Sequence, residues 1–284
     1  MKTKYLKIQQ PTWDGILYPV NHYKDKIVIV VSGSDGGLEH ASKHARYLAG
    51  HGIPSLALAL FKTKHTGKYL NEVPIERVKE VIQYLKSQDY QKIAMDGTSK
   101  GCEYTFACAL EYPDISCVIV KTPSYFYSEG LIKGKPSRAC CWSKENKSLP
   151  YTPYKENNKS VFRMILENKE FNILEMNTGK TIVPASIIPI NKLNIPILMF
   201  STKVDTVWPS YDSCLTMMKT LEQHQYKYPY KHIAFEHMSH MMLEYCGKEI
   251  KYFIKSEKED PEACYKERDI MGEETMKWLK EVWE

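Results

Sequence analysis

The 284-residue chain has no long hydrophobic run and no block of like charges. No apolar stretch reaches about 18 residues, so the sequence predicts no membrane-spanning helix. The net charge is +5, but the basic residues are scattered among acidic ones, and a nucleic-acid-binding stripe is not indicated. The first fifteen residues lack the apolar segment of a signal peptide. We therefore expect a cytoplasmic protein without membrane or nucleic-acid partners.

Motifs for metal, disulfide and nucleotide chemistry are also missing. The eight cysteines form no C-x-x-C pair, which favours free, buried thiols. G-x-G-x-x-G is absent, so a nucleotide-binding fold is not indicated. His40 and His44 stand four residues apart in a helical pattern, but H-E-x-x-H and a third ligand are lacking. We predict that both are exposed helix residues and that the protein uses no metal or redox cofactor.

Apolar β-branched runs alternate with amphipathic helical stretches along most of the chain. This alternation predicts an α/β fold with a mostly parallel central sheet and helices on both faces. The predicted strands cover residues 4–10, 15–20, 26–33, 54–61, 92–97, 115–123, 195–205 and 230–236, and the predicted helices cover residues 38–52, 74–88, 104–110, 211–224 and 272–283.

The alternation of predicted strands and helices stops between about residues 124 and 188. This stretch is rich in Lys, Asn, Pro and Tyr, and residues 160–171 form its one clear helical piece. We interpret this stretch as a long irregular insertion, and such an insertion at the C-terminal end of a strand in a doubly wound sheet covers the crevice where ligands bind. We predict a cap-like segment here.

The stretch "DGTSKGCE", residues 96–103, places Ser99 between two glycines at a strand-to-helix turn. G-x-S-x-G at such a turn is the nucleophile elbow of the α/β-hydrolase fold, where the flanking residues must be small. A glycine-rich turn that only packs is the alternative. We predict that Ser99 is a catalytic nucleophile at the start of a helix whose positive end faces the reacting atom.

A serine nucleophile needs a base held by an acid, and in this fold the chain order is Ser, acid, His. Asp205 follows the predicted strand that ends "ILMFST", in "KVDTVWPS". His237 and His240 both follow the last predicted strand. We favour His240 as the base because its loop reaches further back toward Ser99, and we keep His237 as the alternative.

Two backbone N–H groups are needed to bind the oxyanion of an acyl-transfer intermediate. One is expected from Lys100, the residue after the nucleophile. The other is expected from the loop "SGSDGG", residues 32–37. There we favour Asp35, with Ser34 as the second choice.

Five segments resemble the catalytic domain shared by acyl-CoA thioesterases and bile acid-CoA:amino acid N-acyltransferase. They are "VSGSDGGLEHASKHARYLAGHGIPSLALALF", "VPIERVKEVIQYLKSQ", "DGTSKGCEYTFACALEYPDISCVIVKTPSYF", "IPILMFSTKVDTVWPS" and "EDPEACYKERDIMGEETMKWL". The resemblance runs from about Lys26 onward. It implies a triad acting on an acyl thioester, and this triad maps onto Ser99, Asp205 and His240. The transferase branch of the family has a similar pattern but carries cysteine as the nucleophile. The serine at this position therefore favours hydrolysis over transfer to an amine.

The chain departs from the family pattern in two places. Only about 25 residues precede the first central strand, so we expect a single α/β-hydrolase domain over residues 1–284, without the family's N-terminal β-sandwich. The usual S-G-x-D-D before W-P-S reads "STKVD" here. The sequence thus favours an acyl-CoA thioesterase-like enzyme of lipid metabolism acting on a small-molecule substrate. A carboxylesterase or peptidase-like hydrolase, an N-acyltransferase and a non-catalytic binding protein are the alternatives.

Overall fold

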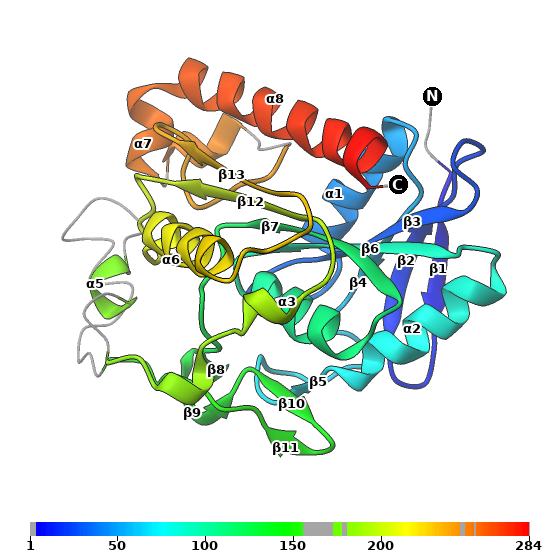
Figure 1. Ribbon diagram of the computed structural model, residues 1–284, viewed down its shortest axis with the longest axis horizontal. Helices are drawn as coiled ribbons and strands as arrows, with labels where there is room; N and C mark the ends of the chain where they lie inside the picture. Colours follow the sequence, from blue (N-terminus) through cyan, green and yellow to red (C-terminus); the bar gives the residue numbers. More distant parts are fainter. Residues whose placement is uncertain (1–3, 156–172, 178–180, 245–247, 253, 284) are drawn as a thin grey trace.

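The computed structural model describes residues 4–155, 173–177, 181–244, 248–252 and 254–283 (Figure 1). Within them an eight-stranded sheet has the strand order β1-β2-β4-β3-β6-β7-β12-β13. Its members are β1 (Leu6–Gln9), β2 (Asp14–Tyr18), β3 (Lys26–Val31), β4 (Ser55–Leu58), β6 (Lys92–Thr98), β7 (Ile115–Lys121), β12 (Ile197–Thr202) and β13 (Tyr230–Phe235).

The sheet is parallel from β4 to β13, whereas β1 and β2 form an antiparallel pair at one edge. All six residues of β3 are buried, as its continuous apolar run predicted, because helices cover both faces of a parallel sheet. The fold is the mostly parallel α/β-hydrolase sheet that the sequence predicted.

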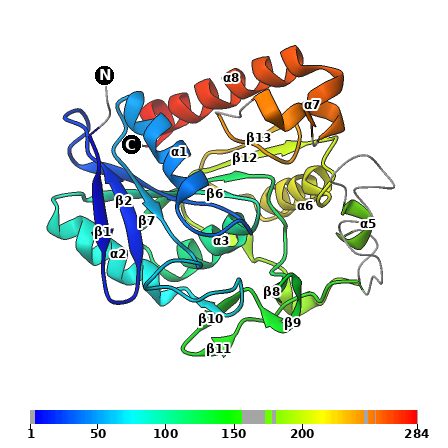
Figure 2. The same ribbon diagram turned by 180° about the vertical axis from the view of Figure 1, so that it is seen from behind.

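Two groups of helices cover the two faces (Figures 1 and 2). On one face lie α1 (Glu39–Gly50) and α8 (Pro261–Lys277), and on the other lie α2 (Glu76–Ser87), α3 (Lys100–Glu111) and α6 (Ser210–Gln223). Each group packs its apolar side against the sheet and closes one hydrophobic core. None of the helices among the described residues is both long and apolar enough to cross a bilayer.

The C-terminal helix is longer than the sequence predicted. The helical pattern predicted a start near residue 272, but α8 begins at Pro261 and continues into the π-helical turn η4 (Trp278–Val282). Asp260 caps it by accepting a hydrogen bond from the Ala263 N–H at 3.0 Å. The many charged residues of its first turns hide the apolar stripe, whereas the Asp-Pro start is a cap signal in the sequence.

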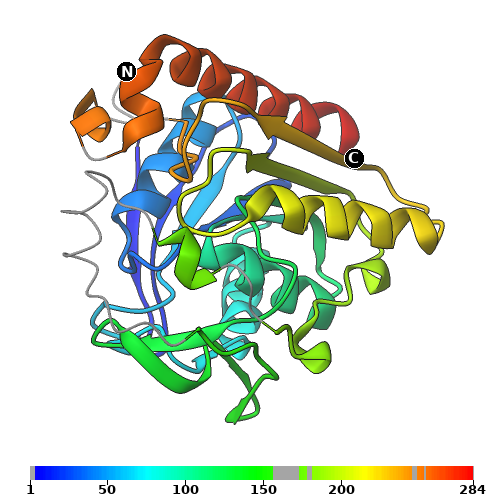
Figure 3. The same ribbon diagram turned by 90° about the vertical axis from the view of Figure 1, so that its left-hand side faces the viewer.

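The segment predicted to be irregular contains short strands. β8 (Glu129–Ile132) pairs with β9 (Lys135–Cys140), and β10 (Trp142–Lys144) joins β11 (Lys147–Ser148) and β5 (Val73–Pro74). Short elements α5 (Leu174–Asn177), η1 (Pro184–Ser186) and η2 (Ile190–Lys192) follow, and η3 (Lys248–Tyr252) and α7 (Lys255–Glu259) precede α8. The two small sheets lie beyond α3, away from α8 (Figures 1 and 3).

The prediction of an irregular segment was therefore wrong for residues 129–148. Strands of two to six residues that are rich in Lys and Ser carry little periodic signal, so the sequence did not show them. The helical piece predicted for residues 160–171 lies outside the described residues.

Candidate active site

Ser99 lies at the sharp turn between β6 and α3. Its backbone has φ 56° and ψ −124°, a conformation that is strained for a residue with a side chain. A Cβ on Gly97 would lie 2.6 Å from the Gly101 carbonyl oxygen, and one on Gly101 would lie 2.5 Å from that of Ser32. The glycines are needed at both positions because backbone approaches them too closely for a side chain. The turn therefore has the geometry of a nucleophile elbow.

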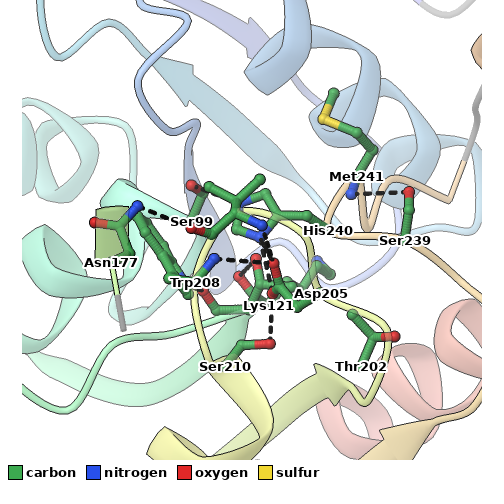
Figure 4. Close-up of polar contacts among 12 residues, drawn as sticks. Ser99, Lys121, Asn177, Thr202, Asp205, Trp208, Ser210, Ser239, His240 and Met241 are labelled. Atoms are coloured by element: carbon green, nitrogen blue, oxygen red, sulfur yellow. Dashed lines mark hydrogen bonds and ion pairs between the residues drawn. The ribbon is translucent and has the colours of Figure 1, made fainter. Parts of the chain in front are cut away.

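The structure brings Ser99, His240 and Asp205 together in one hydrogen-bonded chain (Figure 4). His240 Nε2 lies 2.9 Å from Ser99 Oγ. On the other side of the ring, His240 Nδ1 lies 2.9 Å from Asp205 Oδ2 and 3.0 Å from Oδ1. A carboxylate at Nδ1 keeps the proton on that nitrogen, so Nε2 is free to accept one from the serine hydroxyl.

His237, the alternative base, does not join this chain. It is exposed, and its backbone N–H donates to the Glu267 carboxylate of α8 at 3.0 Å. The same carboxylate accepts the Met238 N–H at 2.6 Å. This part of the loop therefore serves as an anchor, and His240 is the histidine that faces Ser99.

Asp205 is buried and held by the residues that follow it. Its Oδ1 accepts the N–H of Val207 at 2.9 Å and that of Trp208 at 3.2 Å. Its Oδ2 accepts the hydroxyl of Ser210 at 2.6 Å. These bonds aim the carboxylate at His240. Ser210 ends the stretch D-x-x-W-P-S, whose spacing is a signal for this turn, but no role was predicted for Ser210 from the sequence.

Trp208 supports the other side of the site. Its ring meets the His240 ring edge-on, with centroids 5.0 Å apart, and its Nε1–H donates to the Thr122 carbonyl at 2.9 Å. The Lys100 ammonium lies 5.2 Å from the Trp208 ring centroid, within cation–π range. The imidazole is thus held by an indole whose own position is determined by β7 and α3.

Lys100 and Glu103 form a buried polar cluster under the elbow. Lys100 Nζ lies 3.3 Å from Glu103 Oε1 and also contacts Ser128 Oγ. Glu103 Oε2 accepts the Ser128 N–H and the Trp142 Nε1–H, each at 2.9 Å. Burial alone would lower the pKa of Lys100, but Glu103, Tyr154 and Cys141 together outweigh burial and raise it. The cluster ties the inserted segment to the first turn of α3, a link that no sequence period indicates.

A cavity of about 160 Å³ opens beside Ser99. It has a mostly apolar lining that includes Val31, Ala41, Ile173, Val207, Met241, Leu243 and Ile254. Ser34 and Asp35, the two choices for the second oxyanion donor, also line this cavity. Lys100 is the first residue of α3, where backbone N–H groups have no partner within the helix.

His44 contradicts the prediction that it is an exposed helix residue. Its side chain is 3% exposed and lies between the carboxylates of Asp96 and Glu244. The burial of His44 leaves no signal in the sequence, because Asp96 and Glu244 come from distant parts of the chain. His40, one turn earlier, is half-buried and lines the cavity. Among the described residues, no group of three or more His, Cys, Asp or Glu side chains is arranged to hold a metal ion.

Residues 73–246 match the family model "BAAT / Acyl-CoA thioester hydrolase C terminal". The chain belongs to this family. No curated protein sequence matches it. Membership in the BAAT / acyl-CoA thioester hydrolase family and the α/β-hydrolase fold together indicate a hydrolase of the esterase or thioesterase type.

Solved structures of two esterases and of a putative dienelactone hydrolase share the fold of this BAAT-family chain. The Pyrococcus furiosus esterase Pf2001 is 16% identical with a TM-score of 0.57, over 99% of this chain and 94% of its own. Est1E from Butyrivibrio proteoclasticus is 14% identical with a TM-score of 0.55, over 98% of both chains. A putative dienelactone hydrolase from Klebsiella pneumoniae is 15% identical with a TM-score of 0.56, over 96% of both. At these identities the likeness concerns the fold alone.

Proposed function

We propose that the protein is an acyl-CoA thioesterase-like hydrolase in which Ser99, His240 and Asp205 act as the catalytic triad. The observation that carries the proposal is the hydrogen-bonded chain from Ser99 Oγ through His240 to Asp205 beside an apolar cavity. Family membership supports the acyl thioester as the substrate class.

In the first half-reaction, His240 Nε2 takes the proton of Ser99 Oγ as the oxygen attacks the thioester carbonyl carbon. The N–H of Lys100 and the N–H of Asp35 then hold the oxyanion of the tetrahedral intermediate. The C–S bond breaks, His240 returns the proton to the leaving thiolate, and the acyl group stays on Ser99 as an oxygen ester. Asp205 stabilises the imidazolium that forms in between.

In the second half-reaction, His240 takes a proton from water, which attacks the acyl-serine carbonyl. Collapse of this intermediate releases the free acid and restores the Ser99 hydroxyl. We expect the acyl chain to lie against the apolar part of the cavity lining, which includes Val207, Met241 and Leu243. An oxygen ester is less open to amines than a thioester, so the serine nucleophile favours water over an amino acid as acceptor.

Product analysis of the native protein and Ser99→Ala tests this proposal. Each is incubated with acyl-CoAs and with p-nitrophenyl esters, with and without glycine or taurine, and the products are identified by mass spectrometry. We expect the native protein to release CoA and free acid, and Ser99→Ala to lose about a million-fold in kcat, as when a triad is broken. The exposed Ser87 at the end of α2 supplies the matched control, Ser87→Ala, which should remain active.

Other products would point to other functions. Turnover of simple esters without CoA release would replace the thioesterase with a carboxylesterase. Amide formation by the native protein would make it a transferase. Activity of Ser99→Ala above a few per cent of native would remove Ser99 as the nucleophile.

A further inference from the structure

Four ionisable side chains meet in the interior beside the site, and the reaction described above uses none of them. They are His44 of α1, Asp96 of β6, Lys121 at the end of β7 and Glu244 on the loop after β13, and we refer to them as the buried quartet. Each side chain is at most 3% exposed. Burying ionised groups costs free energy unless they are paired with good geometry, so the contacts within the quartet decide its effect.

The two cations and two carboxylates of the quartet alternate. His44 Nδ1 lies 2.5 Å from Glu244 Oε2, and His44 Nε2 lies 2.7 Å from Asp96 Oδ2. Lys121 Nζ donates to Asp96 Oδ1 and Oδ2 at 2.8 and 2.7 Å. Lys121 Nζ also lies 3.1 Å from Glu244 Oε1, as an ion pair rather than an aligned hydrogen bond. Asp96 and Glu244 each contact both cations.

Both ring nitrogens of His44 face carboxylates, so an imidazole that carries two protons donates to both Glu244 and Asp96. His44 Nε2 also lies 3.0 Å from Lys121 Nζ, so an imidazole protonated only at Nδ1 would accept from Lys121 and lose its bond to Asp96. Burial alone would lower the pKa of His44, but Asp96 and Glu244 outweigh burial and Lys121 and raise it to about 9. Burial would raise the pKa of Glu244, but His44 and Lys121 lower it to about 2. At neutral pH the quartet holds two positive and two negative charges and is neutral as a whole.

The quartet joins the strand that carries Ser99 to the loop that carries His240. Asp96 stands three residues before Ser99 in β6, and Glu244 stands four residues after His240. Between His240 and Glu244 the loop is a tight turn, in which the Met242 N–H donates to the His240 carbonyl at 2.8 Å. His44 itself lines the cavity beside Ser99. A shift of Glu244 would therefore move His240 relative to Ser99.

Other charged groups hold the same loop from α7 and α8. Glu257 accepts the Ser239 N–H and hydroxyl and pairs with the buried Arg268, and Glu267 accepts the amides of residues 236–238. These contacts hold the start of the loop, and Arg268 also donates to the Met241 carbonyl at 3.4 Å, whereas Glu244 holds the far end of the loop. Tyr47, on the same helix as His44, is near enough to Glu244 and Lys121, and to Asp269 and Glu273 of α8, for their charges to act on its hydroxyl.

We propose that Glu244 is a positioning residue for His240, held in place by Lys121 and the doubly protonated His44. The proposal rests on the proposed catalytic function of the triad. Loss of the His44 proton removes one cation and leaves the quartet with net charge −1. Glu244 then faces a neutral imidazole instead of a cation, and the His240–Ser99 distance is no longer fixed.

The sign of the pH dependence follows from the pKa of His44. The folded state binds this proton more tightly than the unfolded state, so its contribution is complete below about 6.5 and is lost as pH rises through about 9. We therefore expect kcat to fall as pH rises through about 9. The lowered pKa of Glu244 keeps its charge through this whole range.

The kinetic test uses p-nitrophenyl ester turnover and labelling by a fluorophosphonate, since both report the triad whatever the natural leaving group. We expect His44→Gln and Glu244→Gln to lower kcat at pH 7 by about tenfold to 100-fold, with KM changed less than about threefold. Their kcat profiles should lack the fall near pH 9, because the group that titrates there is gone or uncoupled. A role in folding alone would lower the Tm and leave the alkaline limb of the kcat profile as in the native enzyme.

Two further variants keep the test decisive. His40→Gln is the matched control, since it removes a cavity-lining imidazole one turn away and should keep the alkaline limb. Lys121→Met with Glu244→Gln removes one charge of each sign and leaves Asp96 and His44 paired, so this double variant should fold even if Glu244→Gln does not. It should still show the low kcat, because the loop anchor is missing.

A measurement that does not depend on catalysis tests the positioning role of Glu244 separately from the proposed hydrolase activity. The readout is the protection against hydrogen exchange of the peptide covering residues 236–244. In the native protein, the protection factors of this peptide should fall between about pH 8 and 10. In Glu244→Gln they should already be low at pH 7. Unchanged protection in Glu244→Gln, or native-like kcat profiles in both quartet variants, would overturn the positioning role. An inactive native protein whose loop loses protection as described would reject the hydrolase while keeping Glu244 as the anchor.

Discussion

Asp205 and Trp208 hold His240 from two directions. The carboxylate fixes one ring nitrogen at 2.9 Å, and the indole meets the ring edge-on at 5.0 Å between centroids. The two supports leave the imidazole one orientation, with Nε2 toward Ser99. An imidazole that is already oriented loses little freedom when the transition state forms, which is how positioning lowers a barrier.

The two histidines of the base loop should differ sharply in effect. We predict that His240→Ala lowers kcat by about a million-fold, nearly as much as Ser99→Ala, because the members of a triad act as a unit. His237→Ala should change kcat only a few-fold, since its exposed ring takes no part in the triad. Initial rates of ester hydrolysis by the two variants show which histidine is the base. If the order of the two effects were reversed, the base would be His237.

At the scale of elements, the elbow depends on how closely α3 approaches β3. The backbone of Gly101 lies so near β3 and its following loop that an added Cβ would sit 2.5 Å from the Ser32 carbonyl oxygen and 3.0 Å from that of Val31. Both neighbours are backbone atoms of a buried segment, which cannot rotate away. The position of Ser99 above the sheet thus depends on this contact.

A methyl group at this contact should destabilise the protein. We predict that Gly101→Ala lowers the free energy of unfolding by about 1–3 kcal/mol through overpacking and lowers kcat by displacing Ser99. Gly50→Ala is the control, because Gly50 ends α1 with nothing within 4 Å of an added Cβ. Alanine there should be neutral or slightly stabilising. Urea unfolding of both variants measures the difference, and an equal effect would show that the close approach does not matter.

At the scale of the whole molecule, two histidines limit stability on opposite sides of neutrality. His44 is held protonated inside the molecule, and its contribution is lost on the alkaline side. His232 of β13 is half-buried, with Nε2 2.7 Å from Ser201 Oγ, and burial lowers its pKa to about 4. The fold thus favours one charged and one neutral imidazole at pH 7.

The acid side of the stability profile should depend on His232. As pH falls below 6.5 the unfolded chain takes up a proton at this residue, whereas the folded state does so only near 4. We predict that the free energy of unfolding falls over this interval by about 1–2 kcal/mol from this group, after allowing for its partial exposure. His232→Gln should remove that slope. Urea unfolding at pH 4.5 and 6.5 compares the two proteins, and equal slopes would count against His232.

Much of the architecture was determined by local pattern in the sequence. The apolar runs of β3, β6, β7 and β12 and the amphipathic helices between them predicted the sheet and its two covered faces. A strand buried on both faces leaves a continuous apolar run, and a helix buried on one side leaves a helical period. The elbow was predictable as well, since its strain and close backbone contacts restrict residues 97 and 101 to glycine. The short strands at residues 129–148 left no such signal.

Only the tertiary structure decided which polar side chains meet. Spacing alone left His237 and His240 both open, and it placed His44 on the surface, whereas the folded chain buries His44 between Asp96 and Glu244. Lys100, Glu103 and Trp208 likewise find their partners across long sequence separations. Hydrophobic burial depends on the residues of one segment, so the apolar pattern of that segment predicts it. Charge pairing depends on two or more distant segments at once, so it is determined only when the sheet and its loops have been assembled.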